Sequence, residues 1–245
     1  MSDYLKLKLI ILFQHIVAII GLVFFFSWTG IAVALGMWLL YYAYGMITGF
    51  HRIFAHKSFT ISRTNKVLML LFGSLSGMGS SIGWVGQHRW HHAYADQEGV
   101  DPYYSKNTVL SKFVAWFLYP ANINFKISVV KDLIRDADHS FFHKHYYKIL
   151  FAWVLILAVI NPWLVVFAWA LPNVLTYTAL TLVGVLGHNI GTQPYTDKDQ
   201  SRDSHFLSLF TLGESYQNAH HDNPTLVVNG RFDFIGYVNK IFLKS

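Results

Sequence analysis

Long apolar stretches with almost no charge constrain this chain more than any other feature. A transmembrane helix needs about 20 such residues, and four stretches reach or approach that length. Of the 245 residues, 53% are hydrophobic and only 13% are charged, about half the charged fraction of an ordinary soluble domain. The sequence therefore predicts an all-α integral membrane protein. The predicted transmembrane helices cover residues 7–28, 30–50, 149–160 with the turn near 162, and 163–187.

Basic residues predict the orientation of these helices. All 19 lysines and arginines lie at the start of the first span, between the second and third spans, or after the fourth. Positive charge favours the cytoplasmic side, so we expect a multi-pass protein with both termini in the cytoplasm, in a bacterial inner membrane or an ER-type membrane. The net charge of +6 fits the surface of an anionic bilayer better than nucleic acid. Residues 51–148 and 188–245 would form a cytoplasmic helical cap within a single domain, 1–245.

The segment 67–85 is long enough to cross the membrane but is rich in glycine and serine. If it crossed, His88 would lie on the opposite side of the membrane from His51. We therefore expect this segment to be re-entrant or to lie along the membrane interface.

Histidines gather at the predicted cytoplasmic ends of the spans. The chain has 13 of them, and three groups follow recognisable spacings: His-x4-His, His-x2-His-His and Gln-x2-His-His. Positions i, i+3 and i+4 share one face of a helix, so the members of each of the last two groups project together. A further histidine ends the fourth span. The residues are His51, His56, His88, His91, His92, His188, Gln217, His220 and His221.

So many imidazoles on one side of a membrane indicate a metal site. Neutral imidazole binds iron, zinc and copper, and the number of nitrogens exceeds what one tetrahedral zinc uses, so two metals are expected. The chain has no cysteine, which excludes zinc–thiolate and cysteine-ligated iron–sulfur sites. A metal carrier, a haem-binding electron carrier and a transporter are less favoured alternatives, because only His15 lies in mid-span.

The sequences around these histidines resemble the membrane fatty acid desaturases, in the acyl-CoA (delta-9) desaturase-like branch. GFHRIFAHKSF (49–59) resembles the first histidine box, GWVGQHRWHHAYADQEGVDPY (83–103) the second, and LFTLGESYQNAHHDNP (209–224) the third. The resemblance implies four transmembrane helices with a cytoplasmic cap that carries two iron ions. It assigns one iron to His51, His56, His88, His92 and His220, and the other to His91, His188 and His221, with Gln217 where the family usually has histidine.

The implied activity is the introduction of a cis double bond, delta-9-like, into a long acyl chain. Dioxygen would be the co-substrate and be reduced to water, with no catalytic side chain beyond the metal centre. Electrons would come from an external donor, a cytochrome b5-like protein or a ferredoxin. The acyl carrier stays open between coenzyme A, a carrier protein and a glycerolipid, because Gly86 and Gln87 replace the Arg-Asp pair of related acyl-CoA enzymes.

Two further sets of residues are expected to serve the site. Ligating histidines usually donate their other N–H to a carboxylate or carbonyl, and four acids flank the boxes: Asp96, Asp101, Glu214 and Asp222. A dry apolar tunnel should hold the acyl chain, and its candidate residues are Leu35, Leu39, Tyr42 and Trp84.

Two alternatives keep the same scaffold. One is a hydroxylase or another diiron oxidase acting on acyl chains or lipids. The other is a degenerate desaturase whose second metal site is impaired by Gln217.

Overall fold

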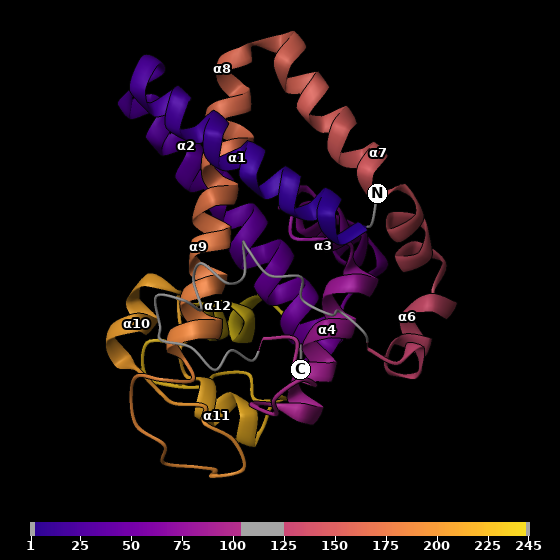
Figure 1. Cartoon of the computed structure of the whole chain (residues 1–245), viewed down its shortest axis with the longest axis vertical. Coiled ribbons are helices and arrows are strands. Elements are labelled where there is room, and N and C mark those ends of the chain that lie inside the picture. Colours follow the sequence, from indigo (N-terminus) through magenta and orange to yellow (C-terminus); the bar gives the residue numbers. More distant parts are fainter. Residues whose placement is uncertain (1–2, 104–124, 244–245) are drawn as a thin grey trace. The chain divides into compact units, whose positions relative to one another are not determined.

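The structure is a computed structural model that describes residues 3–103 and 125–243. In these two ranges every regular element is a helix (Figure 1), which confirms the all-helical prediction for that part of the chain. Extended pairing there is confined to isolated bridges of Asp203 with Thr192 and with Tyr216.

Four helical stretches are long and apolar enough to cross a membrane, as the sequence predicted. The third of them begins before the predicted residue 149, because its first turns are polar and escape a search for apolar residues. The four stretches are α1 (Asp3–Phe25); α2 (Trp28–Trp38) with η1 (Leu39–Ala55); α7 (Ala137–Ile160); and α8 (Pro162–Val165) with η3 (Val166–Ala170) and α9 (Leu171–Leu186).

Short polar caps separate consecutive spans. Ser27 precedes α2, and its hydroxyl accepts a hydrogen bond from the Gly30 N–H at 3.0 Å. Asn161 precedes α8 and accepts from the Trp163 N–H at 3.0 Å, with Pro162 at the first helical position. Both patterns satisfy N–H groups that a helix start leaves unpaired, so α7 and α8 are joined by a tight turn (Figure 1).

The remaining helices are shorter. The segment 67–85 is divided between two of them, because α3 ends at Leu75 and α4 begins at Ser81. That this segment does not cross the membrane stays a prediction. The shorter helices are α3 (Arg63–Leu75), α4 (Ser81–Tyr94), η2 (Ile127–Val130), α6 (Lys131–Arg135), α10 (His205–Phe210), α11 (Gln217–Asp222) and α12 (Phe234–Phe242).

The chain divides into two compact units, whereas a single domain was expected; that expectation stays a prediction. The first unit comprises Met1–Phe50, Arg63–Trp84 and Asp132–Thr178. The second unit comprises His51–Ser62, Val85–Lys131 and Ala179–Ser245. Every histidine of the three boxes therefore belongs to the second unit, together with the ends of the second and fourth spans.

Close helix packing in the first unit depends on glycine. A Cβ placed on Gly45 of η1 would lie 2.4 Å from the backbone nitrogen of Gly73 in α3, so these two helices meet backbone to backbone. A Cβ on Gly30 would lie 2.7 Å from the ring of Phe167. Small residues permit such approach between membrane helices, and α1 and α2 both pack against η3.

Candidate metal centre

Eight histidines of the second unit form two groups. We call the first the five-histidine group: His51, His56, His88, His92 and His220. We call the second the three-histidine group: His91, His188 and His221. Within each group, ring nitrogens that could bind a metal lie within 4.8 Å of one another. The histidines come from η1 and the turn after it, from α4, from the turn after α9 and from α11.

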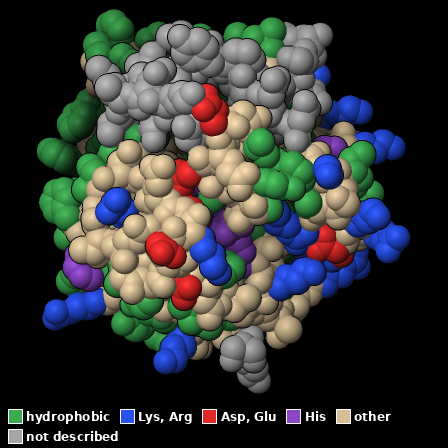
Figure 2. Space-filling view, turned by 60° about the horizontal axis from the view of Figure 1, so that its bottom comes forward, with side chains coloured by type: hydrophobic (Ala, Val, Ile, Leu, Met, Phe, Trp, Pro, Cys, Tyr) green, Lys and Arg blue, Asp and Glu red, His purple; other side chains and the backbone are tan. Residues whose placement is uncertain are grey.

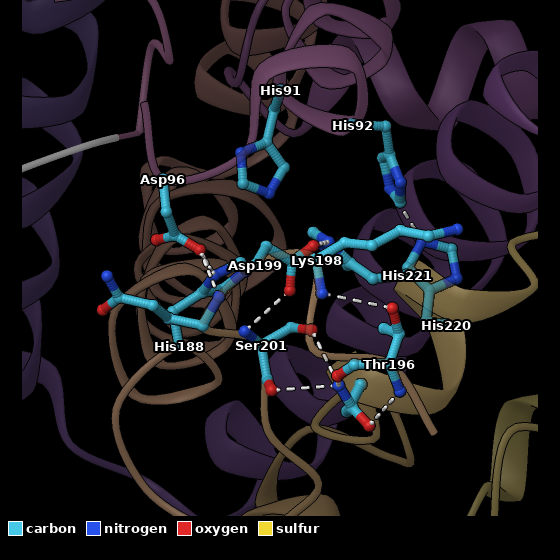
Figure 3. Close-up of polar contacts among 12 residues, drawn as sticks. His91, His92, Asp96, His188, Thr196, Lys198, Asp199, Ser201, His220 and His221 are labelled. Atoms are coloured by element: carbon cyan, nitrogen blue, oxygen red, sulfur yellow. Dashed lines mark hydrogen bonds and ion pairs between the residues drawn. The ribbon is translucent and has the colours of Figure 1, made fainter. Parts of the chain in front are cut away.

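The Nε2 atoms of the five-histidine group converge. The Nε2–Nε2 distances are 2.9 Å for His51 and His220, 2.8 Å for His56 and His88, 3.1 Å for His92 and His88, and 3.0 Å for His92 and His220. Two nitrogens bound at right angles to one metal, with bonds of about 2.1 Å, would be about 3 Å apart. The donor set therefore fits a metal ion, and Figure 3 shows His92 and His220 turned toward each other.

The winding of η1 explains how His51 and His56 come together. Residues five apart do not share a face of an α-helix. In η1, however, hydrogen bonds run from residue i+5 to residue i, and the His56 N–H donates to the His51 carbonyl at 3.2 Å. This winding places the two imidazoles on one side, with ring centroids 5.1 Å apart. Such π-helical segments are rare in proteins overall, but those that do occur are often found at functional sites.

The three-histidine group is compact and buried. Its ring centroids are 5.2 Å apart for His91 and His188, 5.1 Å for His91 and His221, and 4.9 Å for His188 and His221. The Nε2 atoms of His188 and His221 are buried without a hydrogen-bond partner. A buried polar atom left in this state costs about 1–3 kcal/mol. A metal ion bound to these two nitrogens would remove that cost, so this donor set also fits a metal.

Carboxylates contact the Nδ1 atoms of four of these histidines. Such a contact requires Nδ1 to carry the proton, which leaves the lone pair of Nε2 for the interior of the group. Figure 3 shows one of these contacts, between Asp96 and His188. The pairs are His51 with Glu214 at 2.7 Å, His91 with Asp101 at 2.9 Å, His188 with Asp96 at 2.9 Å, and His221 with Asp199 at 2.6 Å.

The surroundings favour the neutral form of five of the eight imidazoles. Burial, and then repulsion from neighbouring histidines, lowers the pKa of His56, His88, His92 and His220 well below the usual value. Burial also lowers the pKa of His221 to about 4, although its hydrogen bond to Asp199 opposes the shift. Metal binding requires the neutral imidazole, so the protein holds these five candidate ligands in the form that binds.

Comparison with known proteins identifies the family to which this arrangement belongs. A family model described as fatty acid desaturase matches residues 27–228, which is most of the chain. The chain belongs to the fatty acid desaturase family. It is therefore a membrane protein and an oxidoreductase that acts on fatty acyl chains, as the resemblance of the histidine boxes indicated.

The names of relatives of this desaturase contain different forms of acyl substrate. The chain is 29% identical over 213 residues to an sn-2 palmitoyl-lipid 9-desaturase of Nostoc sp. (strain 36), with 85% of this chain and 75% of the relative covered. It is 29% identical to acyl-CoA desaturase 1 of Saccharomyces cerevisiae, with 76% and 39% covered. It is 28% identical to a hex-5-enoyl-[acyl-carrier protein] acetylenase of Moorena producens, with 78% and 65% covered. The palmitoyl-lipid 9-desaturase and the acyl-CoA desaturase support the branch that the resemblance indicated.

The four acids predicted to serve the desaturase site do not all have the same surroundings. Asp96, Asp101 and Glu214 each contact a histidine Nδ1, as described above. Asp222 lies exposed at the end of α11, and its role stays a prediction. The contact of Asp199 with His221 was not anticipated. The only sequence signal was an acidic loop after the fourth span, and nothing local links that loop to a histidine 22 residues later.

Gln217 of the desaturase is buried beside the third box. Its Nε2 donates to the carbonyl oxygen of Glu214 at 2.7 Å, which leaves its amide oxygen as the atom that could face a cation. A Cβ on Gly187 would lie 2.6 Å from the Gln217 Cγ, so that glycine makes room for the side chain. Ligation by Gln217 stays a prediction.

The tunnel candidates of the desaturase lie in the first unit. Leu35 and Leu39 are 47% and 49% exposed, whereas Tyr42 is fully buried and stacks on Trp38 with ring centroids 5.3 Å apart. Trp84 is half-buried and lies 6.3 Å from the ring of Phe50. Of the three candidates on the second span, Tyr42 alone faces the protein interior, and its role in the tunnel stays a prediction.

Some histidine side chains of the desaturase are accessible from the protein surface. Figure 2 shows histidine side chains reaching the surface in the middle of this face, with basic and acidic side chains around them. Two members of the five-histidine group, His56 and His92, are partly exposed. Among the described residues, the five-histidine group is therefore not fully enclosed.

Proposed function

We propose that this chain is a diiron desaturase that introduces a cis double bond, delta-9-like, into a long acyl chain. The observation that carries this proposal is the convergence of eight histidine side chains into two adjacent groups, with carboxylates on the outer nitrogens of four of them. One iron would be held by the five-histidine group. The other would be held by the three-histidine group, with Gln217 as a further ligand. The iron ions, when bound, would supply the activation of dioxygen.

The side chains of the protein hold the site in a form ready for metal. Asp101, Asp96 and Asp199 orient three of the histidines by accepting hydrogen bonds from Nδ1. Glu214 contacts the Nδ1 of His51 at 2.7 Å. Burial favours the neutral form of five of the imidazoles by lowering their pKa. The unpartnered Nε2 atoms of His188 and His221 would gain a partner when metal binds. These residues thus prepare the site for metal before any substrate is present.

The overall reaction needs electrons that the acyl chain does not provide. Removing two hydrogens from adjacent methylenes supplies two electrons and two protons, and reducing one dioxygen to two waters consumes four of each. The remaining two electrons would come from an external donor, a cytochrome b5-like protein or a ferredoxin, and the protons from water. The excess of basic residues between the second and third spans supports an acidic partner.

The same basic residues support the proposed topology. Lysines and arginines are absent from the turns near residues 26 and 161 and present in the other connections, which favours both termini and the histidine groups on the cytoplasmic side. The acyl chain would be carried by coenzyme A, a carrier protein or a glycerolipid, the three forms that the names of the relatives contain.

The test starts with the purified protein in detergent. We expect about two irons per chain by elemental analysis and no optical signature of haem. Expression in a host that lacks its own desaturase should then produce new cis-monoenoic acyl chains, and separate analysis of acyl-CoA, acyl-carrier-protein and glycerolipid fractions identifies the carrier.

Other results would favour the alternatives. Hydroxylated acyl chains in place of unsaturated ones would identify a hydroxylase on the same scaffold. One iron per chain, rising to two in Gln217→His, would identify a degenerate second metal site. No bound iron in either protein would overturn the proposal.

A further inference from the structure

Arg52 follows His51 directly and is buried in the second unit, with 2% of its side chain exposed. Its Nη2 contacts the Oε1 of Glu214 at 2.5 Å and the Oδ1 of Asp233 at 2.8 Å. Its Nε donates to the same Glu214 oxygen at 3.2 Å, and its Nη1 donates to the Val227 carbonyl at 2.8 Å. The guanidinium is therefore held on three sides by groups far from it in sequence.

Glu214 connects this arginine to a candidate metal ligand. One oxygen of Glu214 accepts from Arg52, and the other contacts the Nδ1 of His51 at 2.7 Å. The orientation of the carboxylate is thus set by the guanidinium on one side and determines the orientation of the imidazole on the other. A displacement of Arg52 would be transmitted to His51 through a single side chain.

Asp233 holds the far side of the guanidinium. It is fully buried, and its Oδ1 also accepts from the Gly236 N–H at 2.7 Å, which caps α12. Its Oδ2 accepts from the Asn229 N–H at 2.8 Å. Three hydrogen bonds thus fix this carboxylate, so it provides a rigid anchor for Arg52. Asp233 lies beyond residue 228, where the match to the family model ends.

The other carboxylates that contact histidines are held differently. Within the described residues, Asp96 accepts from the backbone N–H of Gln200, Asp101 from those of Asp96 and Tyr103, and Asp199 from that of Ser201. These acids are oriented by backbone N–H groups, whereas Glu214 is oriented by a buried cation. The three-histidine group therefore does not depend on Arg52 or Asp233.

We propose that Arg52 and Asp233 are positioning residues for the five-histidine group, acting on His51 through Glu214. This inference rests on the proposed function, because it assumes that the group binds metal. Loss of Asp233 leaves a buried guanidinium with one carboxylate in place of two, and removing one partner of a buried ion pair is strongly destabilising. We expect the guanidinium to move toward Glu214, its remaining carboxylate. The His51 imidazole then loses its orientation, while the three-histidine group keeps its own.

The test is a titration of the full-length, chelator-stripped protein in detergent with Co²⁺, followed by its visible absorption. We expect two binding steps in the wild type, and the step that disappears in His56→Ala belongs to the five-histidine group. In Asp233→Ser and Asp233→Asn that step should weaken by about 10–100-fold, the usual effect of losing a partner of a ligand. The other step should be unchanged. Serine at this position keeps an oxygen that can cap α12 but withdraws the carboxylate from Arg52.

A matched control separates this effect from the general loss of a carboxylate–cation pair at a helix N-terminus. Asp136 caps α7 and contacts Lys66 at 2.7 Å, and it lies in the first unit. Asp136→Asn removes a capping carboxylate paired with a cation, as Asp233→Asn does, but should leave both Co²⁺ steps unchanged. Arg52→Lys keeps the charge without the planar fork and should reproduce the selective loss, which provides an independent measurement if the Asp233 variants do not fold.

Three results have distinct meanings. Unchanged Co²⁺ binding in folded Asp233 or Arg52 variants would overturn the inference, and Asp233 would then be only a helix cap. Equal weakening of both steps would also overturn it, because a general loss of structure does not select one group. A wild-type protein that binds no Co²⁺ would instead contradict the proposed function.

Discussion

The backbone N–H of His56 donates to the carbonyl oxygen of His51, five residues before it, at 3.2 Å. An α-helix would pair residues four apart and would place these two imidazoles on different faces. The wider winding of η1 brings their ring centroids to 5.1 Å. The first histidine box can therefore contribute both of its side chains to one group.

Replacing His56 should remove one metal from the protein. We expect His56→Ala to lower the bound iron from about two to about one per chain, because the five-histidine group loses a nitrogen from its interior. The control is His15→Ala, since His15 lies in α1, contacts the Ile11 carbonyl of its own helix at 2.7 Å and belongs to the first unit. Elemental analysis of both proteins decides the matter, and two irons in His56→Ala would show that His56 is not a ligand.

Asp199 should contribute more to metal binding than the exposed Asp197 does. Asp199→Asn removes the carboxylate that contacts the His221 Nδ1 at 2.6 Å, so the three-histidine group should bind Co²⁺ about 10–100-fold more weakly. Asp197 lies two residues earlier and is exposed, and Asp197→Asn should bind as the wild type does. Equal affinities in the two variants would mean that the contact of Asp199 with His221 does not tune the metal site.

The metal-free protein should lose stability as the pH falls below about 6.5. The pKa of His221 and of four histidines in the five-histidine group is lowered in the folded state, so the unfolded chain takes up protons first. Each such group can cost up to about 1.4 kcal/mol per pH unit below 6.5. For His221 the loss levels off below about pH 4.

Thermal unfolding in detergent between pH 7.5 and pH 5 measures this effect. Carboxylates in the unfolded chain titrate near pH 4, so the histidines dominate in this window. A midpoint temperature that stays constant or rises as the pH falls from 6.5 to 5 would contradict the expectation.

A methyl group on Gly45 should destabilise the first unit. Its Cβ would lie 2.4 Å from the Gly73 nitrogen and 2.7 Å from the Phe72 carbonyl carbon, and backbone atoms cannot move aside as a side chain can. We expect Gly45→Ala to cost about 1–3 kcal/mol of unfolding free energy. Gly36→Ala is the control, because nothing lies within 4 Å of its Cβ; it should be neutral or slightly stabilising. Equal thermal midpoints would mean that η1 and α3 do not pack closely.

The sequence by itself predicted the features that depend on neighbouring residues. Four apolar stretches indicated four membrane-spanning helices, because hydropathy is a property of a continuous segment. The spacing of His88, His91 and His92 indicated that these side chains project together, because i, i+3 and i+4 share a helix face. The resemblance of the boxes indicated the desaturase family, which the comparisons confirmed.

Only the tertiary structure decided which distant residues meet. Asp199 contacts a histidine 22 residues away, and Arg52 contacts Asp233 across 181 positions; no local pattern encodes either pair. Tyr42 faces inward whereas Leu35 and Leu39 face outward, although all three suit a membrane helix equally well by hydropathy. The proximity of the His51 and His56 imidazoles likewise depends on the π-helical winding of η1. Such contacts are decided by how the chain packs around its helices, and packing depends on side chains that are distant in sequence.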